Sequence, residues 1–268
     1  MYKIVFIAMI TLITGCAEPA ADYLIVAHRG ASQDAPENTI PSFLLAWEQG
    51  ADAIEGDFFL TTDQEIVCIH DSRTGRFSDV DLIVSESTLE ELRQIDVGAW
   101  KDDKWSGTVI PSLAGVFETV PRGKKIFVEI KQGVEILPKL YGEIDRSGLK
   151  NEQIVIISFN SDVIKAVKRD RPEHNAYWLS GLSYDNHGNV VPGPETVIET
   201  LESTGADGFS SHHGLVTREF IEQITDAGYE YHVWTVNDPE RAWELKEFGA
   251  LSITTDVPGL IREYFQKQ

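Results

Sequence analysis

The sequence predicts an α/β fold, a closed (β/α)8 barrel of the TIM type, with a hairpin and a small insertion after its second strand. Two observations predict this fold. Apolar, strand-like runs alternate with segments in which apolar residues recur at helical spacing, and the chain has 268 residues, 42% of them hydrophobic. Eight such units in a chain of this length favour one closed barrel over an open sheet.

The strand-like runs are separated by segments that fit helices. In TREFIEQITDAG (217–228) and DPERAWELKEFGA (238–250), apolar residues recur every three or four positions and a glycine closes the end, which is typical of a helix and its C-cap. The predicted strands cover residues 23–28, 52–60, 126–131, 154–159, 176–180, 207–211, 231–236 and 251–256.

The second strand departs from this alternation. The segment EIVCIHD (65–71) follows it after only the turn-like TTDQ, which is too short for a helical crossover. We therefore expect an antiparallel hairpin at this point. Residues 72–110 are polar with scattered aromatics and predict an insertion, after which PSLAGVFETV resumes a barrel helix.

Residues 1–15 are predicted to be a lipoprotein signal peptide, because Lys3 is followed by the apolar run IVFIAMITLI, which is too short to span a bilayer. The run ends in LITGC, which resembles the lipobox of bacterial lipoproteins, where cleavage precedes the cysteine and Cys16 carries the lipid. The alternative is an ordinary secretory signal peptide cleaved near Cys16. Residues 16–22 then form a tether, and residues 23–268 form the barrel domain.

On this interpretation the protein is exported and held in the bacterial cell envelope by a lipid anchor at Cys16. Ala17 stands where an aspartate is associated with retention in the inner membrane, so the outer membrane, on its periplasmic or surface side, is expected. With Cys16 lipidated, only Cys68 remains and no intramolecular disulfide can form. Cys68 lies in an apolar stretch and is expected to be a small buried side chain rather than a catalytic thiol.

The formal net charge of the chain is −20. A protein that tracks phosphates needs a basic stripe, so this composition argues against nucleic acid or an anionic membrane surface as the main partner. An anionic substrate would need positive charges gathered at one place. The sequence predicts no oligomeric state.

Acidic side chains gather near the ends of neighbouring predicted strands. Glu55 and Asp57 are two residues apart on one strand, so both point to the same side, and Glu129 lies on the next barrel strand. The C-terminal strand ends of such barrels build the active site. Three converging carboxylates repel one another without a cation, and an all-oxygen set favours Ca²⁺, Mg²⁺ or Mn²⁺ over zinc. The alternative is a structural ion-pair network in which Lys131 or Arg29 neutralises Glu129.

Two histidines fall at the same end of the predicted barrel. His28 closes the first strand and His70 closes the hairpin return. Beside a metal ion, such a pair suits acid and base catalysis on a phosphodiester, because one group removes a proton from the nucleophile and the other protonates the departing alkoxide. We expect structural roles for His174, His187 and His232, and a solvated loop for His212 and His213.

Short motifs follow one another in a specific order along the chain. They are HRGA and PENT (28–31 and 36–39), GADAIEGD (50–57), CIHD (68–71), IPSL (110–113), VEIK (128–131), ISF (157–159), WTVN (234–237) and TTDVP (254–258). In their joint order and spacing, over essentially the whole mature chain, they resemble the glycerophosphodiester phosphodiesterase family.

The resemblance implies one Ca²⁺ or Mg²⁺ ion held by Glu55, Asp57 and Glu129, with His28 and His70 as the acid and base. It implies further roles in substrate binding: Arg29 and Lys131 contact phosphate, Glu37 and Asn38 line or brace the site, and Phe159 and Trp234 are aromatics near the substrate. The implied reaction hydrolyses a small glycerophosphodiester to sn-glycerol 3-phosphate and an alcohol, through attack of the glycerol 2-hydroxyl and a cyclic phosphate. The long loop at 181–194 is expected to affect access to the site.

Two other functions remain open at this point. One is a related barrel enzyme of phospholipase C or D type that acts on intact phospholipids, which a lipid anchor would suit. The Glu-x-Lys of VEIK and the motifs WTVN and TTDVP favour the glycerophosphodiesterase instead. The other is a non-catalytic surface lipoprotein, which is disfavoured because every expected metal, acid–base and phosphate position holds a competent residue.

Overall fold

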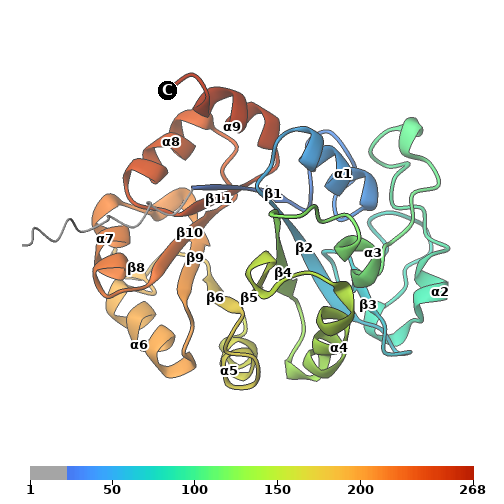
Figure 1. Cartoon of the computed structure of the whole chain (residues 1–268), viewed down its shortest axis with the longest axis horizontal. Helices are drawn as coiled ribbons and strands as arrows, with labels where there is room; N and C mark the ends of the chain where they lie inside the picture. Colours follow the sequence, from blue (N-terminus) through green and yellow to red (C-terminus); the bar gives the residue numbers. More distant parts are fainter. Residues whose placement is uncertain (1–22) are drawn as a thin grey trace, which may run out of the picture.

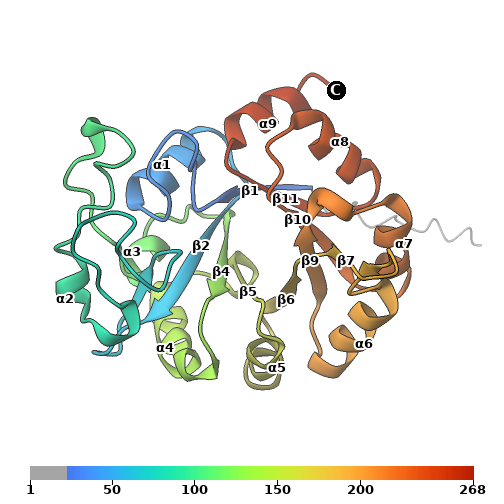
Figure 2. The same ribbon diagram turned by 180° about the vertical axis from the view of Figure 1, so that it is seen from behind.

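Eight parallel strands close into a barrel (Figures 1 and 2). The computed structural model describes residues 23–268, so the predicted signal peptide, the tether and Cys16 lie outside the described residues. The first strand pairs with both the last and the second, which closes the barrel. The barrel strands are β1 (Leu24–His28), β2 (Ala53–Leu60), β4 (Lys125–Ile130), β5 (Ile154–Ser158), β6 (Asn175–Ser180), β9 (Gly208–His212), β10 (Glu230–Trp234) and β11 (Ser252–Thr255). Each predicted run forms one of these strands, so the predicted fold is confirmed.

Helices surround the barrel and bury their apolar faces against the strands (Figure 1). The first of them is capped by Thr39, whose hydroxyl accepts the Ser42 N–H, and Pro41 lies in its first turn, where proline is tolerated. The outer helices are α1 (Ile40–Glu48), α3 (Leu113–Phe117), α4 (Leu137–Ser147), α5 (Ser161–Asp170), α6 (Pro194–Thr204), α7 (Arg218–Asp226), α8 (Pro239–Glu247) and α9 (Pro258–Phe265). No helix within residues 23–268 is long and apolar enough to cross a membrane.

The predicted hairpin and insertion are both present. Strand β3 (Ile66–Cys68) pairs antiparallel with β2, and the insertion that follows contains the short helix α2 (Leu89–Leu92). The insertion has a small core of its own against the hairpin, made of Phe59, Val67, Ile69, Val84, Leu92, Ile95, Val97 and Ile110. The loop at 181–194 folds into a two-stranded sheet of β7 (Ser183–Tyr184) and β8 (Val190–Val191), which the sequence did not predict.

The chain enters the barrel at the N-terminal ends of the strands. The Tyr23 hydroxyl donates to the carbonyl of Ala242 in α8, at 3.2 Å, and its ring lies 5.5 Å from that of Phe265 in α9. The first strand then runs from this face of the barrel to the opposite one, where it ends at His28.

The loop between β1 and α1 depends on a glycine. Gly30 has a φ of +84°, a left-handed conformation that side chains rarely adopt. A Cβ at this position would lie 2.6 Å from the Ser42 carbonyl carbon and 2.7 Å from the Ser42 Cβ. Gly30 therefore lets the loop pass closely over the first turn of α1.

We predict that Gly30→Ala destabilises the protein more than Gly123→Ala. Gly123 has a φ of +81°, but a Cβ added there would meet open space, so its substitution should cost only backbone strain, about 1 kcal/mol. At Gly30 the overlap with Ser42 should add about 1–3 kcal/mol. Urea unfolding of the two variants measures the difference, and equal losses would show that Ser42 moves aside freely.

Candidate active site

A cavity of about 140 Å³ opens at the C-terminal ends of the barrel strands. Its walls bring together residues that the sequence analysis singled out on separate strands and strand ends. Those that line the cavity are His28, Arg29, Glu55, His70, Glu129, Lys131, Phe159 and Trp234. These eight predicted residues thus converge on one place, whereas Asp57, Glu37 and Asn38 do not line the cavity. The chemical roles of all of them stay predictions.

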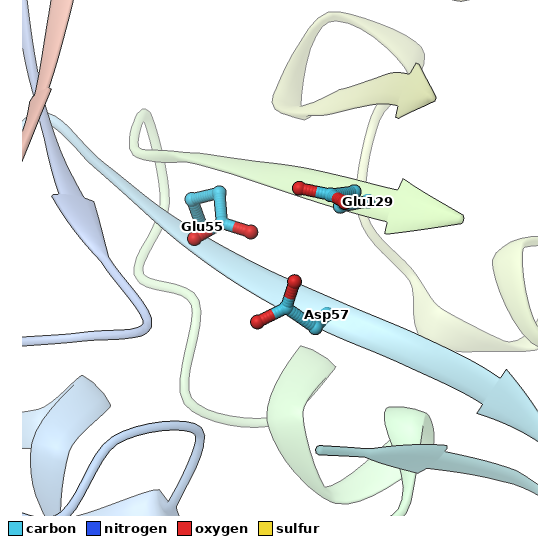
Figure 3. A group of neighbouring side chains, drawn as sticks. All are labelled: Glu55, Asp57 and Glu129. Atoms are coloured by element: carbon cyan, nitrogen blue, oxygen red, sulfur yellow. The ribbon is translucent and has the colours of Figure 1, made fainter. Parts of the chain in front are cut away.

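Three carboxylates converge beside this cavity (Figure 3). Glu55 and Asp57 come from β2 and Glu129 from β4, and one oxygen atom of each lies within 4.8 Å of the others. Asp57 and Glu129 are directly opposite each other in the register of the two strands. The Oε1 atom of Glu55 is buried and has no hydrogen-bond partner among the described residues. An oxygen atom placed in this way is suited to a cation.

Two basic side chains partly neutralise these carboxylates. Lys131 Nζ lies 2.8 Å from Glu129 and 3.2 Å from Asp57, and Arg29 Nε lies 3.2 Å from Asp57. The ion pairing of Glu129 that was considered as an alternative is therefore present. This ion pairing does not neutralise the site, because three carboxylates face only two basic side chains. An oxygen-rich site with one negative charge in excess fits a divalent ion such as Ca²⁺ or Mg²⁺.

The carboxyl groups differ in their readiness to ionise. Burial, and then the charge of Asp57, raises the pKa of Glu55 and of Glu129. Burial acts in the same direction on Asp57, but the charges of Lys131 and Arg29 outweigh it and lower the pKa of Asp57. A bound cation would favour the ionised form of all three.

His28 is held by Asp256, a residue for which the sequence analysis gave no role. His28 Nδ1 lies 2.7 Å from Asp256 Oδ1. Ser32 Oγ donates to the same oxygen at 2.9 Å, and Asn237 Nδ2 donates to Oδ2 at 2.7 Å. Burial acts to raise the pKa of Asp256, but the hydrogen bond with His28 and the charge of His28 lower it to about 2. The carboxylate can therefore orient the imidazole and leave Nε2 for substrate.

His70 has a similar arrangement with a different partner. Its Nδ1 lies 2.7 Å from Asp71 Oδ1, and Arg76 of the insertion lies 3.0 Å from the other oxygen of Asp71. Arg76 also contacts Glu37, which in turn contacts Arg29 at 3.0 Å. Arg76 carries no signal in the sequence, because it lies in a polar segment without a periodic pattern.

Asn38 lies behind the carboxylates. Its Nδ2 donates to Asp57 Oδ2 at 2.8 Å, and its Oδ1 accepts the Asp57 N–H at 3.2 Å. Cys68 is buried, its Sγ lies 3.2 Å from the same amide oxygen, and burial raises the pKa of its thiol well above the usual value. Cys68 is thus the small buried side chain that was expected.

Aromatic rings form the other wall of the cavity. The rings of Phe159 and Trp234 meet edge to face, 5.6 Å apart, and His212 packs against Trp234 at the same distance. His232 is buried, and its Nδ1 shares a hydrogen bond of 2.8 Å with Ser252, in keeping with its expected structural role. It also lines the cavity, which the sequence did not predict.

Comparisons with known proteins agree with one another. The model of the glycerophosphoryl diester phosphodiesterase family matches residues 28–260. A glycerophosphodiester phosphodiesterase of Caldanaerobacter subterraneus subsp. tengcongensis is 34% identical over 242 residues, which cover 88% of this chain and 94% of the relative. The structure of a phosphodiesterase from Oleispira antarctica, in complex with the product sn-glycerol-3-phosphate, has a TM-score of 0.82 at 26% identity and covers 91% of this chain and 96% of that chain.

We predict that Asp256→Asn lowers stability in a pH-dependent manner. The pKa of Asp256 is lowered in the folded protein from an ordinary value of 3.8, so its contribution is present above about pH 4 and is lost as the pH falls toward 2. Because the side chain is partly exposed, we expect a loss of about 1 kcal/mol at pH 7. Denaturant unfolding at pH 7 and pH 2.5 measures it, and a deficit that is the same at both values would mean that packing, not charge, is lost.

Proposed function

The chain belongs to the glycerophosphoryl diester phosphodiesterase family, and on this premise we propose that it hydrolyses glycerophosphodiesters to sn-glycerol 3-phosphate and an alcohol. The observation that carries the proposal is the convergence of two His–Asp pairs, two basic side chains and three carboxylates at one cavity. The Oleispira relative was solved with sn-glycerol-3-phosphate as its product, and this supports the same product here.

The site attracts an anionic substrate although the chain carries a net charge of −20. Arg29 and Lys131 both line the cavity, so each can contact an anionic phosphodiester directly. A divalent cation held by Glu55, Asp57 and Glu129 supplies further positive charge to the phosphoryl oxygens when bound.

The two histidines perform the proton transfers. One removes the proton from the glycerol 2-hydroxyl, whose oxygen attacks phosphorus, and the other donates a proton to the oxygen of the leaving alcohol. The products of this step are the free alcohol and a cyclic glycerol phosphate, which water then opens to sn-glycerol 3-phosphate. Because each Nδ1 is engaged by an aspartate, Nε2 is the nitrogen available to substrate on both rings. Holding the 2-hydroxyl next to phosphorus favours the intramolecular attack over attack by bulk water.

We also propose that the protein works in the bacterial cell envelope, attached through a lipid at Cys16. The support is the sequence LITGC and the apolar run before it. Mass spectrometry of the N-terminal peptide of the mature protein tests this proposal, since an unmodified Cys16 would contradict it.

The experiment that tests the activity is release of glycerol 3-phosphate from glycerophosphocholine and glycerophosphoethanolamine by the protein from Ala17 onward. We expect release with Ca²⁺ or Mg²⁺ and loss of release with a chelator, because Arg29 and Lys131 leave one of the three carboxylate charges unbalanced. Calorimetry with each ion then measures binding directly. A folded protein that leaves these diesters intact but cleaves whole phospholipids would instead support the phospholipase alternative.

We predict that His28→Ala and His70→Ala each reduce kcat by roughly 100-fold or more, the usual scale for an acid or base residue. The matched control is His187→Ala, because His187 is an exposed histidine in the loop at 181–194 and does not line the cavity. Its kcat should equal that of the wild type. Near-normal turnover in either of the first two variants would remove that histidine from the proposed mechanism.

A further inference from the structure

The insertion at residues 72–110 contacts the active site from outside the barrel. It packs its small core on the β2–β3 hairpin, beside α1 and α3 (Figures 1 and 2). Two of its basic side chains reach the loops that carry the site. Lys101 Nζ donates to the Ser32 carbonyl at 2.8 Å, and the Arg76 guanidinium contacts Asp71 and Glu37.

Arg76 joins two carboxylates through all three of its nitrogen atoms. Its Nε lies 3.0 Å from Asp71 Oδ2, its Nη1 3.1 Å from Glu37 Oε2, and its Nη2 2.6 Å from Glu37 Oε1. Each carboxylate uses another contact to hold a site residue: Asp71 holds His70 at 2.7 Å, and Glu37 holds Arg29 at 3.0 Å. The Arg76 guanidinium therefore contacts both the carboxylate that holds His70 and the carboxylate that holds Arg29.

The guanidinium itself is held in place by the insertion. Its central carbon lies 4.6 Å from the centre of the Phe77 ring and 5.9 Å from that of Trp100. A planar guanidinium can stack on such rings while its edge donates to carboxylates, which a lysine ammonium cannot do in the same way. Arg76 does not line the cavity, so it acts on the reaction only through other residues.

We propose that Arg76 is a positioning residue of the active site, through which the insertion fixes the orientation of both His70 and Arg29. This inference rests on the proposed function of that site. Without Arg76, the carboxylates of Asp71 and Glu37 lose the cation that they share, and His70 and Arg29 gain conformational freedom. Loss of the Arg76 contacts should lower the catalytic rate more than the stability, because the side chains of Arg76 and Asp71 are both about 40% exposed and their ion pair contributes little to stability.

The test compares Arg76→Ala and Arg76→Lys with the wild type, using glycerophosphocholine as substrate. Removal of a residue that holds a site residue in place typically lowers activity roughly 10–100-fold, and we expect a loss of kcat/KM in this range for Arg76→Ala. Arg76→Lys should recover only part of the activity, because one ammonium cannot hold both carboxylates. The matched control is Arg73→Ala, because Arg73 lies in the same insertion, pairs with Asp81 and does not line the cavity. It should retain wild-type activity.

A double-mutant cycle distinguishes positioning from general damage to the fold. If Arg76 acts partly through His70, Arg76→Ala should cost several-fold less in a His70→Ala background than in the wild type. Full activity in Arg76→Ala or in Arg76→Lys would overturn the proposal, and so would an undiminished loss in the His70→Ala background. If Arg76→Ala does not fold, Arg76→Lys decides alone. Inactive wild-type protein would instead contradict the proposed function.

Discussion

Three carboxylates crowded together on two adjacent strands are the constraint on which the rest of the site depends. Parallel pairing of β2 and β4 places Asp57 directly opposite Glu129, and like charges in that position repel. The contacts of the surrounding residues reduce this repulsion. Lys131 contacts both acids, Arg29 reaches Asp57 from the end of β1, and Asn38 donates to it from behind. The close turn at Gly30 keeps this loop near the carboxylates.

The barrel and the carboxylate cluster could be predicted from sequence because both follow from local patterns. Alternation along a strand determines which side chains point inward, and the strand ends meet at one face. Asp256 lies in the motif TTDVP, but its contact with His28 joins residues 228 positions apart, which no local pattern indicates. Arg76 was missed because its segment has no helical or strand period, and only the folded insertion brings it to Asp71 and Glu37. The short β7–β8 hairpin is too small to leave a pattern in the sequence.

The two histidines that line the cavity are held by different parts of the molecule. Asp256, which holds His28, is itself fixed by Ser32 and Asn237, both in loops that directly follow barrel strands. Asp71, which holds His70, depends instead on an arginine of the insertion. Asp256 is thus fixed by side chains of the barrel loops, whereas Asp71 contacts a side chain from outside the barrel. The insertion reaches the first of these loops as well, where Lys101 donates to the Ser32 carbonyl.

Strand β1 begins on the face of the barrel that lies opposite the cavity, and Tyr23 is fastened there to α8 and α9. Any polypeptide that precedes Tyr23 therefore joins the barrel at the end opposite the cavity. Six residues, 17–22, separate Cys16 from Tyr23, and a fully extended chain of this length reaches roughly 25 Å. A lipid on Cys16 would hold the molecule by this end, with the mouth of the cavity turned toward the aqueous space. If the proposed attachment at Cys16 is present, the cavity would therefore open toward diesters dissolved in the surrounding fluid and away from the lipids of the anchoring leaflet.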